Sequence, residues 1–440
     1  MRVYKPSGIE WLGEIPQSWE NVSIRSCFTE SNQRCNTDSY PLLSVTIANG
    51  IIYQDNIENK KDISNDDKSN YKIVPLNAVA YNKMRMWQGA VGVNTLTTGI
   101  VSPAYIVAIP NEKILPNFVS YLFKSKIMIG EFDKNSYGLC LDMNNLRYDD
   151  FRNIKIPLPP LQEQKEIAEF LDSKCEKIQN YIEKKQKLIT LLQEKKQALI
   201  NKVVTKGLNP NIEFKNSGIA YLGLIPHHWE VKKLKYVGKV VLGKMLCNEH
   251  QKGYSHCYYL KSKNLQWLNV EVSQIEKMWF SEYEKSLYRI KKDDLLVSEG
   301  GEVGKTCIWN NELAECYIQN SVHKITLNKF NNAKFFLYLF FTYGKLGVFD
   351  SVVSRVSIAH LVLEKLVNVD MVVPPLQEQK QIANFLDEKC EKINSAIEKT
   401  KRQIELIKEY KNTLINEAVC GRVACSRDFS PTAQNDKKKN

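Results

Sequence analysis

Residues 159–178 read PPLQEQKEIAEFLDSKCEKI, and almost the same segment, PPLQEQKQIANFLDEKCEKI, returns at 374–393. Seventeen of the twenty positions are identical. A second repeated pair is SGIEWLGEIPQSWE at 7–20 and SGIAYLGLIPHHWE at 217–230, with nine of fourteen positions identical. The two offsets are 215 and 210 residues, so the chain is a tandem duplication of a unit that opens and closes with a shared block.

The closing block predicts a long helix in each copy. A proline pair ends the preceding segment, and no helix breaker follows before Gly207 in the first copy and Gly421 in the second. Apolar residues then recur with heptad spacing, which is typical of helices that pack along one apolar seam. We predict helix–helix packing by Leu171, Cys175, Ile178 and Ile182 in the first copy, and by Leu386, Cys390, Ile393 and Ile397 in the second.

Two such seams in one chain favour an antiparallel intramolecular coiled coil. Polar residues interrupt the seams at Lys185, Lys196, Thr400 and Lys411. Such interruptions commonly fix the register of a coiled coil at some cost in stability. The alternative is a coiled coil between two chains, which does not explain why both helices lie in one chain with nearly identical starts.

Between the shared blocks the two copies diverge, and each middle region has mixed α and β patterns. Alternating and short apolar runs predict strands, and a 3.6-residue period predicts one helix in each copy. The predicted strands are within 42–52, 78–81 and 104–109 and within 258–267, 294–297 and 323–327; the helices are 117–129 and 333–343. Shared ends with different middles indicate one common task for the ends and two separate tasks for the middles.

The expected fold is therefore α+β, with two globular α/β domains separated by the coiled coil and related by pseudo-twofold symmetry. We predict a first variable domain at 1–155, a helix at 156–208, a second variable domain at 209–370, a helix at 371–424 and a disordered tail at 425–440.

The composition suits a polyanionic partner. The net charge is +12 with a pI of about 9.0, and 43% of residues are apolar, enough for packed cores. No apolar run is long enough to span a membrane, and the N-terminus lacks the apolar core of a signal peptide. With no export signal, the 11 cysteines, an odd number, indicate reduced thiols in the cytoplasm. Zinc at Cys247, His250, His256 and Cys257 is a minor alternative, because their spacing matches no standard zinc pattern.

Polar residues in the variable domains are candidates for contact with DNA. Arg and Lys pair with guanine edges, Asn and Gln pair with adenine edges, and basic groups also bind phosphate. The candidates are Asn82, Lys83, Arg85, Trp87 and Gln88 in the first copy and Glu299, Lys305, Asn320, His323 and Lys324 in the second. An alternative is a solvated loop with Trp87 packed onto its domain. Gly89-x-x-Gly92 is expected to correspond to Gly301-x-x-Gly304, with about five extra residues before it in the first copy.

Two sequence features resemble catalytic sites, and we interpret neither as one. Gly300 to Thr306 resembles a phosphate-binding loop, but only three residues separate Gly300 from Gly304-Lys305-Thr306 instead of four. Glu163 and Glu378 could suggest a carboxylate pair, but they lie in the first turn of the predicted helices, where a negative charge favours the helix dipole.

The two duplicated motifs resemble those of type I restriction-modification specificity subunits. The resemblance rests on Gly8 to Glu20 and on the Pro-Pro-Leu-x-Glu-Gln-x-x-Ile helix start, and it covers essentially the whole chain. The segment from Gly99 to Tyr105 also looks like one common in the recognition domains of that family. The second copy has Asn-Ser-Val-His-Lys at 320–324 instead, which indicates two recognition domains of different types.

This resemblance implies a division of labour. Each variable domain would read one half of a split, asymmetric target in double-stranded DNA, and the helices would set the gap between the halves. They would also dock two modification subunits, which bind S-adenosylmethionine and methylate adenine. Two restriction subunits, which are ATP-driven motor nucleases, complete the complex. No cofactor is expected in this chain itself; S-adenosylmethionine, ATP and magnesium are expected in the partner subunits.

Two other functions stay open at this point. A stand-alone DNA methyltransferase is disfavoured, because the sequence has neither an Asn-Pro-Pro-aromatic type of catalytic motif nor a Gly-rich cofactor turn. A non-catalytic coiled-coil adapter that does not bind DNA would be favoured if the chain with its partners showed no salt-sensitive DNA binding.

Overall fold

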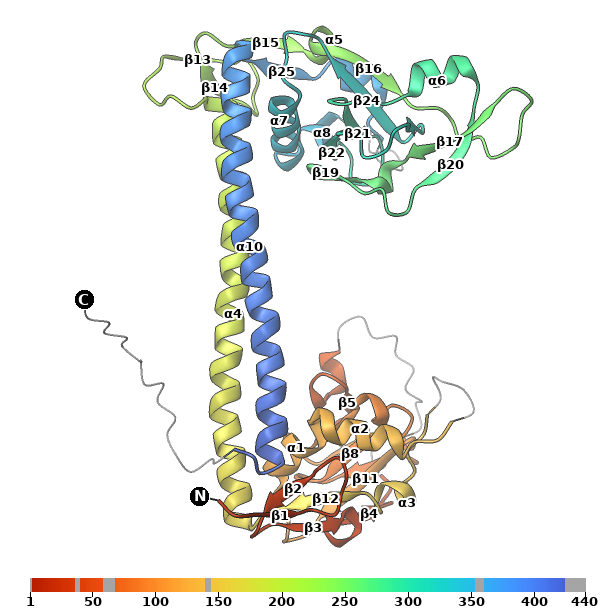
Figure 1. The fold of residues 1–440 in the computed structure, drawn as a ribbon, viewed down its shortest axis with the longest axis vertical. Helices are drawn as coiled ribbons and strands as arrows, with labels where there is room; N and C mark the ends of the chain where they lie inside the picture. The colour runs from red at the N-terminus through yellow and green to blue at the C-terminus, as the bar shows by residue number, and fades with distance from the viewer. Residues whose placement is uncertain (1, 36–39, 58–67, 139–143, 353–359, 424–440) are drawn as a thin grey trace. The chain divides into compact units, whose positions relative to one another are not determined.

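Residues 2–35, 40–57, 68–138, 144–352 and 360–423 are described by the computed structural model (Figure 1). The predicted tail at 425–440 lies outside them. The chain forms two units: unit 1 comprises residues 1–185 and 402–440, and unit 2 comprises residues 186–401. Each unit therefore contains the beginning of one long helix and the end of the other.

The two long helices begin directly after the proline pairs. They are α4 (Leu161–Lys206), with 46 residues, and α10 (Leu376–Val419), with 44 residues. In unit 2 the end of α4 pairs with the start of α10, where Lys196 Nζ donates to Asn394 Oδ1 over 2.9 Å. In unit 1 the start of α4 pairs with the end of α10, and the charge of Lys411 lowers the pKa of the Cys175 thiol against the larger, opposite effect of burial. The helices are thus antiparallel within each unit.

The predicted packing positions of the two helices point into the seam to different degrees. Leu171, Ile178 and Ile182 are buried in unit 1, and Leu386, Cys390 and Ile397 are buried in unit 2. Cys175 and Ile393 are half-buried. Leu191 and Leu406, which lie 215 residues apart, are about half exposed and lie outside the seam.

The variable part of unit 1 is built on a four-stranded antiparallel sheet in the order β4–β11–β8–β9. Its strands are β4 (Phe28–Ser31), β8 (Val79–Asn82), β9 (Val91–Val93) and β11 (Tyr105–Pro110). Smaller antiparallel pairs are β1 (Tyr4–Pro6) with β2 (Glu14–Pro16), β3 (Glu20–Ser23) with β12 (Lys155–Leu158), β5 (Leu43–Thr46) with β6 (Gly50–Tyr53), and β7 (Lys72–Val74) with β10 (Gly99–Val101). The helices are α1 (Pro116–Lys124), α2 (Lys126–Lys134) and α3 (Tyr148–Phe151), with 3-10 turns at Ile24–Ser26, Gln54–Asn56 and Met86–Gln88.

Unit 2 repeats this plan with the sheet order β16–β24–β21–β22. These strands are β16 (Gly238–Leu242), β21 (Leu295–Ser298), β22 (Thr306–Ile308) and β24 (Val322–Leu327). The other strands are β13 (Phe214–Asn216), β14 (Leu224–Pro226), β15 (Glu230–Lys233), β17 (Ser255–Leu260), β18 (Leu265–Gln266), β19 (Asn269–Val270), β20 (Glu276–Phe280), β23 (Tyr317–Ile318) and β25 (Asp370–Val373). The helices are α5 (Leu234–Val237), α6 (Glu282–Tyr288), α7 (Ala333–Lys345), α8 (Val348–Val352) and α9 (Leu363–Val367), with a 3-10 turn at Ser262–Asn264.

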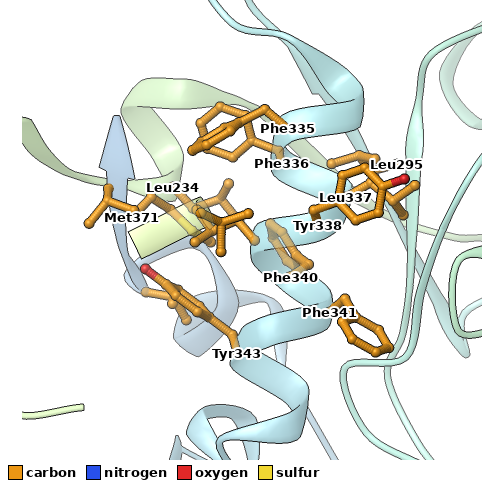
Figure 2. Packing of buried hydrophobic residues seen from close by; sticks show 14 of the residues in the cluster. Leu234, Leu295, Phe335, Phe336, Leu337, Tyr338, Phe340, Phe341, Tyr343 and Met371 are labelled. Carbon is orange, nitrogen blue, oxygen red and sulfur yellow. The ribbon is translucent and has the colours of Figure 1, made fainter. Parts of the chain in front are cut away.

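The core of unit 2 is centred on α7, the helix with the longest apolar run in the sequence. Figure 2 shows its side chains pointing to both sides of the helix, with Tyr343 toward Met371 and Leu337 toward Leu295. In unit 1 an aromatic cluster has the same place, with the ring of Phe123 5.6 Å from Phe132 and 5.8 Å from Phe151. No helix among the described residues is long and apolar enough to cross a membrane.

The shared opening block of each unit is attached to the first turn of a long helix. Trp19 is fully buried and its Nε1 donates to Glu163 Oε2 over 2.8 Å. In unit 2, Trp229 is equally buried and its Nε1 donates to Glu378 Oε2 over 3.0 Å. These carboxylates therefore attach the opening block to the helix start, a contact that their first-turn position alone did not indicate.

The next residue of each helix attaches the variable domain. Gln164 is fully buried; its Oε1 accepts from Leu115 N and its Nε2 donates to Pro159 O, both over 2.8 Å. Gln379 makes the matching bonds with Asn332 N and Pro374 O. The repeated Glu-Gln pair thus connects three parts of each unit: opening block, helix and variable domain.

Candidate nucleic-acid interface

The predicted loop of unit 1 connects β8 to β9 and turns through the short helix Met86–Gln88. Asn82 Oδ1 accepts a hydrogen bond from Met84 N over 3.0 Å, and Trp87 Nε1 donates to Met84 O over 3.1 Å. Met86 is fully buried and anchors the loop to the domain. The loop therefore has a defined backbone from which its polar side chains project.

The five candidate residues of this loop lie at or near the surface. Arg85 and Gln88 are exposed, whereas Asn82, Lys83 and Trp87 are half-buried. The backbone at Lys83 is fixed as well, since its carbonyl accepts from Leu146 N over 2.9 Å. Arg85 and Gln88 are the side chains best placed for contact with a base edge or a phosphate.

Sequence analysis missed one residue that supports this loop. Lys124, the last residue of α1, donates from Nζ to the carbonyl of Gly89 over 2.9 Å. Burial lowers the pKa of Lys124 to about 8. Its place inside the predicted helix 117–129 gave no local signal, because a lysine on a helix is usually solvated.

The corresponding loop of unit 2 runs from 299 to 305 between β21 and β22. Lys305 forms an ion pair with Glu302 at 3.0 Å, and Trp267 Nε1 also donates to Glu302. Glu299 is half-buried; burial raises the pKa of its carboxyl, against a smaller, opposite effect of the nearby His360. Lys305 is thus partly engaged within the protein, with 17% of its side chain exposed.

The structure corrects the expected match between the two glycine pairs. Gly89 and Gly304 each lie two residues before the next strand, and both have positive φ, +87° and +75°. They are therefore equivalent, at an offset of 215 instead of 212. The connections between the paired strands differ in length by only one residue, since they comprise 83–90 in unit 1 and 299–305 in unit 2. The prediction of about five extra residues in the first copy is therefore wrong. The short Gly-x-x-Gly pattern aligned in the wrong register because no neighbouring identity fixed it.

His323 and Lys324 lie inside the protein, which removes them from the predicted interface. Both belong to β24, a central strand, and they are 0% and 8% exposed. His323 Nε2 bonds to the Leu361 carbonyl over 2.6 Å, and Lys324 Nζ donates to the carbonyls of Leu287 and Arg289 over 2.9 and 2.7 Å. Neither side chain can therefore touch DNA in this fold. Asn320, just before the strand, is half-buried and accepts a bond from Gln319.

The cysteines and histidines at 247–257 have a structural setting of their own. The ring of His256 stacks on Trp279 at 4.7 Å, and that of His250 meets the same indole edge-on at 4.6 Å. Among the described residues, no group of three or more His, Cys, Asp or Glu side chains could hold a metal ion.

The segment from Gly300 to Thr306, which resembles a phosphate-binding loop in sequence, differs from one in structure. After Lys305 a strand follows, whereas a phosphate-binding loop leads into a helix.

Comparison with known proteins gives the family context of this architecture. The sequence model of the type I restriction modification DNA specificity domain matches residues 16–193 and 226–406. A protein of Methanocaldococcus jannaschii named as a type I restriction enzyme MjaX specificity subunit is 25% identical, over 94% of this chain and 95% of its own length. The MjaVIII specificity subunit of the same organism is 28% identical over 74% of each chain.

Solved structures share the fold. A chain from a structure of a type I R-M system superposes with a TM-score of 0.70 at 16% identity, covering 93% of this chain and 99% of that one. The HsdS subunit from Thermoanaerobacter tengcongensis superposes with a TM-score of 0.55 at 18% identity, covering 93% of this chain and 98% of its own. These matches confirm the predicted fold class of two mixed α/β domains in tandem with a long helix between them. Because the family model matches twice and the two matches together cover most of this chain, the chain belongs to the type I restriction-modification DNA specificity family.

Proposed function

We propose that this chain is the sequence reader of a type I restriction-modification complex and that each variable domain binds one half of a bipartite, asymmetric target in double-stranded DNA. One observation carries the proposal: each unit has a loop at the equivalent place of its four-stranded sheet, but the side chains of the two loops differ. Unit 1 presents Arg85 and Gln88, and unit 2 has Glu302 and Lys305 there. Two different readers on one repeated scaffold suit two different half-sites.

The same proposal assigns the remaining tasks of the complex to the helices and to other chains. The coiled coil would set the distance between half-sites and dock two modification subunits, and two restriction subunits would complete the assembly. The chain would carry out no chemistry itself, so S-adenosylmethionine, ATP and magnesium would belong to the partners. Engagement of Glu163 and Glu378 with buried indoles supports a structural role for these carboxylates. The complex would work in the cytoplasm, where its DNA lies.

Mapping methylated adenines in host DNA, with and without this gene, tests the proposal directly. We expect one bipartite motif to be methylated only when the gene is present. Replacing Lys83, Arg85 and Gln88 together with Ala should relax base preference in one half of the motif and leave the other half unchanged. An unchanged methylation pattern on deletion of the gene would contradict the proposed function. Absence of salt-sensitive DNA binding by the complex with its modification subunits would instead favour an adapter.

A further inference from the structure

A second surface segment of unit 1 lies beside the β8–β9 loop. The hairpin of β5 and β6 turns at residues 47–49, and its turn is closed by Thr46: Oγ1 accepts from Asn49 N over 3.0 Å and donates to Gly50 O over 3.2 Å. Ile47 is 47% exposed and Asn49 is exposed. The turn is thus rigid at its base and open to solvent at its tip.

Two glycines bring this hairpin against β9. A Cβ atom on Gly92 would lie 2.7 Å from Ile51 N and 2.9 Å from the Gly50 Cα. Real side chains do not tolerate such distances, so this close approach of the two backbones requires glycine at residue 92. The turn is therefore fixed in place against the strand that follows the β8–β9 loop.

Lys124 joins the hairpin turn to the β8–β9 loop directly. Its ammonium donates to three carbonyls: Thr46 O at 3.2 Å, Ile47 O at 2.8 Å and Gly89 O at 2.9 Å. An ammonium group has three donors, so all of them are used within the protein. The side chain is consequently a joint between two loops and is not itself presented to a ligand.

The two segments share a hollow of about 440 Å³. Asn49 lines it from the hairpin turn and Gln88 lines it from the β8–β9 loop, with Lys124 between them. Two primary amides at one surface are suited to a base edge, because an amide offers both a donor and an acceptor to adenine.

Unit 2 has the same joint built from different residues. Tyr121 Oη donates to Asp172 over 2.6 Å, and Tyr338 Oη donates to Asp387 over 2.8 Å, so these tyrosines are equivalent. Three residues after each tyrosine come Lys124 and Phe341. Lys124 and Phe341 therefore occupy the same helix position.

In unit 2, Phe341 packs against a hairpin turn that itself contacts the neighbouring loop. Its ring meets Trp267, in the turn between β18 and β19, at 5.7 Å edge-on. Trp267 in turn donates from Nε1 to Glu302 of the 299–305 loop. The backbone of this turn is held as well, since Leu268 N donates to Thr306 O over 2.9 Å. Both units thus attach a hairpin turn to the neighbouring loop. In unit 1 Lys124 bonds to both segments, and in unit 2 Trp267 of the turn bonds to Glu302 of the loop and packs on Phe341.

We propose that the DNA-reading surface of each domain is composite, made of the hairpin turn and the adjacent loop. Lys124 in unit 1, and Trp267 packed on Phe341 in unit 2, position the two segments relative to each other. In unit 1 Asn49 then reads a base beside the one that Gln88 reads, and Lys124 is a positioning residue. This inference rests on the proposed function and extends it to segments that the sequence did not single out.

The first test uses Asn49→Ala in the complex with its modification subunits. Binding is measured on duplexes in which each position of the methylated motif is varied in turn. Loss of a paired amide should reduce the preference at one or two positions of one half-site roughly 5- to 100-fold, with the other half-site unchanged. Asn117→Ala is the matched control, since Asn117 is an exposed asparagine in the first turn of α1, at the helix end opposite Lys124. Its preferences should equal those of the wild type.

Each result of this test has a distinct meaning. Unchanged preferences in Asn49→Ala would overturn the assignment of the turn, and so would an equal weakening for every sequence, which indicates a phosphate contact. A wild-type complex without any sequence preference would overturn the proposed function itself.

Lys124→Met tests the positioning role. This change keeps the length of the side chain and removes its three donors. We expect the positions read through Asn49 and through Gln88 to lose preference together, with the other half-site and the affinity for the modification subunits unchanged. The double variant with Asn49→Ala should lose no more at the Asn49 position than Lys124→Met alone, because one change acts through the other. Losses of base preference that add up in the double variant, or a Lys124→Met variant with the base preference of the wild type, would refute the positioning role of Lys124.

Discussion

Single hydrogen bonds to two buried indoles attach the beginning of each repeat to the beginning of its long helix. In unit 1 the acceptor Glu163 also pairs with Arg2, and in unit 2 the acceptor Glu378 also bonds to His228 at 2.7 Å. Removing the carboxylate would leave a buried indole N–H without an acceptor, and removing the indole N–H would leave a partly buried carboxylate without one of its donors. These pairs are therefore positions at which a substitution should destabilise the unit.

The Trp19→Phe variant measures this contribution. Phenylalanine keeps the aromatic packing and removes the donor to Glu163, so unit 1 should lose about 1.5 to 3 kcal/mol of unfolding free energy in urea. Trp11→Phe is the matched control, because the equivalent position in the second repeat is already another aromatic, Tyr221. Equal stabilities of the two variants would show that the bond contributes nothing.

His323 should make the stability of unit 2 depend on pH. Burial lowers the pKa of its imidazole below the usual 6.5, against a smaller, opposite effect of the bond to Leu361, and its Nδ1 has no hydrogen-bond partner among the described residues. As the pH falls below 6.5, the unfolded chain takes up this proton before the folded one, so the folded state loses stability. The slope from this group is at most about 1.4 kcal/mol per pH unit.

His323→Gln should flatten that slope, because glutamine keeps a donor for the carbonyl and does not titrate. Urea unfolding of both proteins between pH 7.5 and 5 gives the comparison. Parallel curves would exclude His323 as the source.

At the scale of elements, the sequence predicted most where the signal was local. Both long helices begin at the proline pairs, and the strands β8, β11, β21 and β24 lie in or next to predicted segments. The prediction failed where distant residues decide. Nothing near Lys324 in the sequence indicates that its ammonium group is buried and donates hydrogen bonds to the carbonyls of Leu287 and Arg289. Likewise, only the folded sheet shows that Lys124 reaches a turn more than 70 residues earlier.

The turn before the fourth strand of each sheet gives an element-scale prediction. A Cβ atom on Gly304 would lie 2.1 Å from Phe349 Cδ2, and on Gly89 it would lie 2.8 Å from Ile129 Cδ1. Both glycines also have a positive φ, which costs other residues about 1 to 2 kcal/mol. Gly304→Ala should therefore destabilise its unit more than Gly89→Ala does.

Thermal unfolding of the two variants ranks them. Gly130→Ala, in the exposed part of α2 with open space around it, serves as control and should stabilise by about 0.5 to 1 kcal/mol. A larger loss of thermal stability in Gly89→Ala than in Gly304→Ala would mean that the loop of unit 1 is the more constrained one.

At the scale of the whole molecule, the division into units dictates how the spacer should be altered. Unit 1 pairs residues of α4 up to Lys185 with residues of α10 from Arg402, so a matched insertion of seven residues after Lys185 and after Lys401 leaves both units intact. One heptad keeps the apolar seam in phase. It adds about 10 Å to the coiled coil at about 1.5 Å per residue, or about three base pairs at about 3.4 Å each.

Methylome sequencing of cells that carry this variant should show the same half-sites with a gap longer by one to three base pairs. The change can fall short of three, because B-DNA rotates by about one turn in 10 pairs and both domains must still face a groove. An insertion in α4 alone is the control and should disrupt the pairing with α10. The same gap in the matched variant would show that the partner subunits set the spacing.

The shared long helices also impose an order on biosynthesis. Unit 1 needs residues near both ends of the chain: Tyr4 Oη donates to Gly421 O over 3.2 Å, and a Cβ on Gly421 would touch Pro16. Unit 2 lies within 186–401 and is complete on the ribosome earlier. At about 5 to 20 residues per second, the domain that is translated first waits roughly 10 to 50 seconds for its last helical turns. During that time Trp19, which lies close to Gly421 in the folded unit, lacks part of its cover, so the nascent first domain exposes part of its core until α10 is complete.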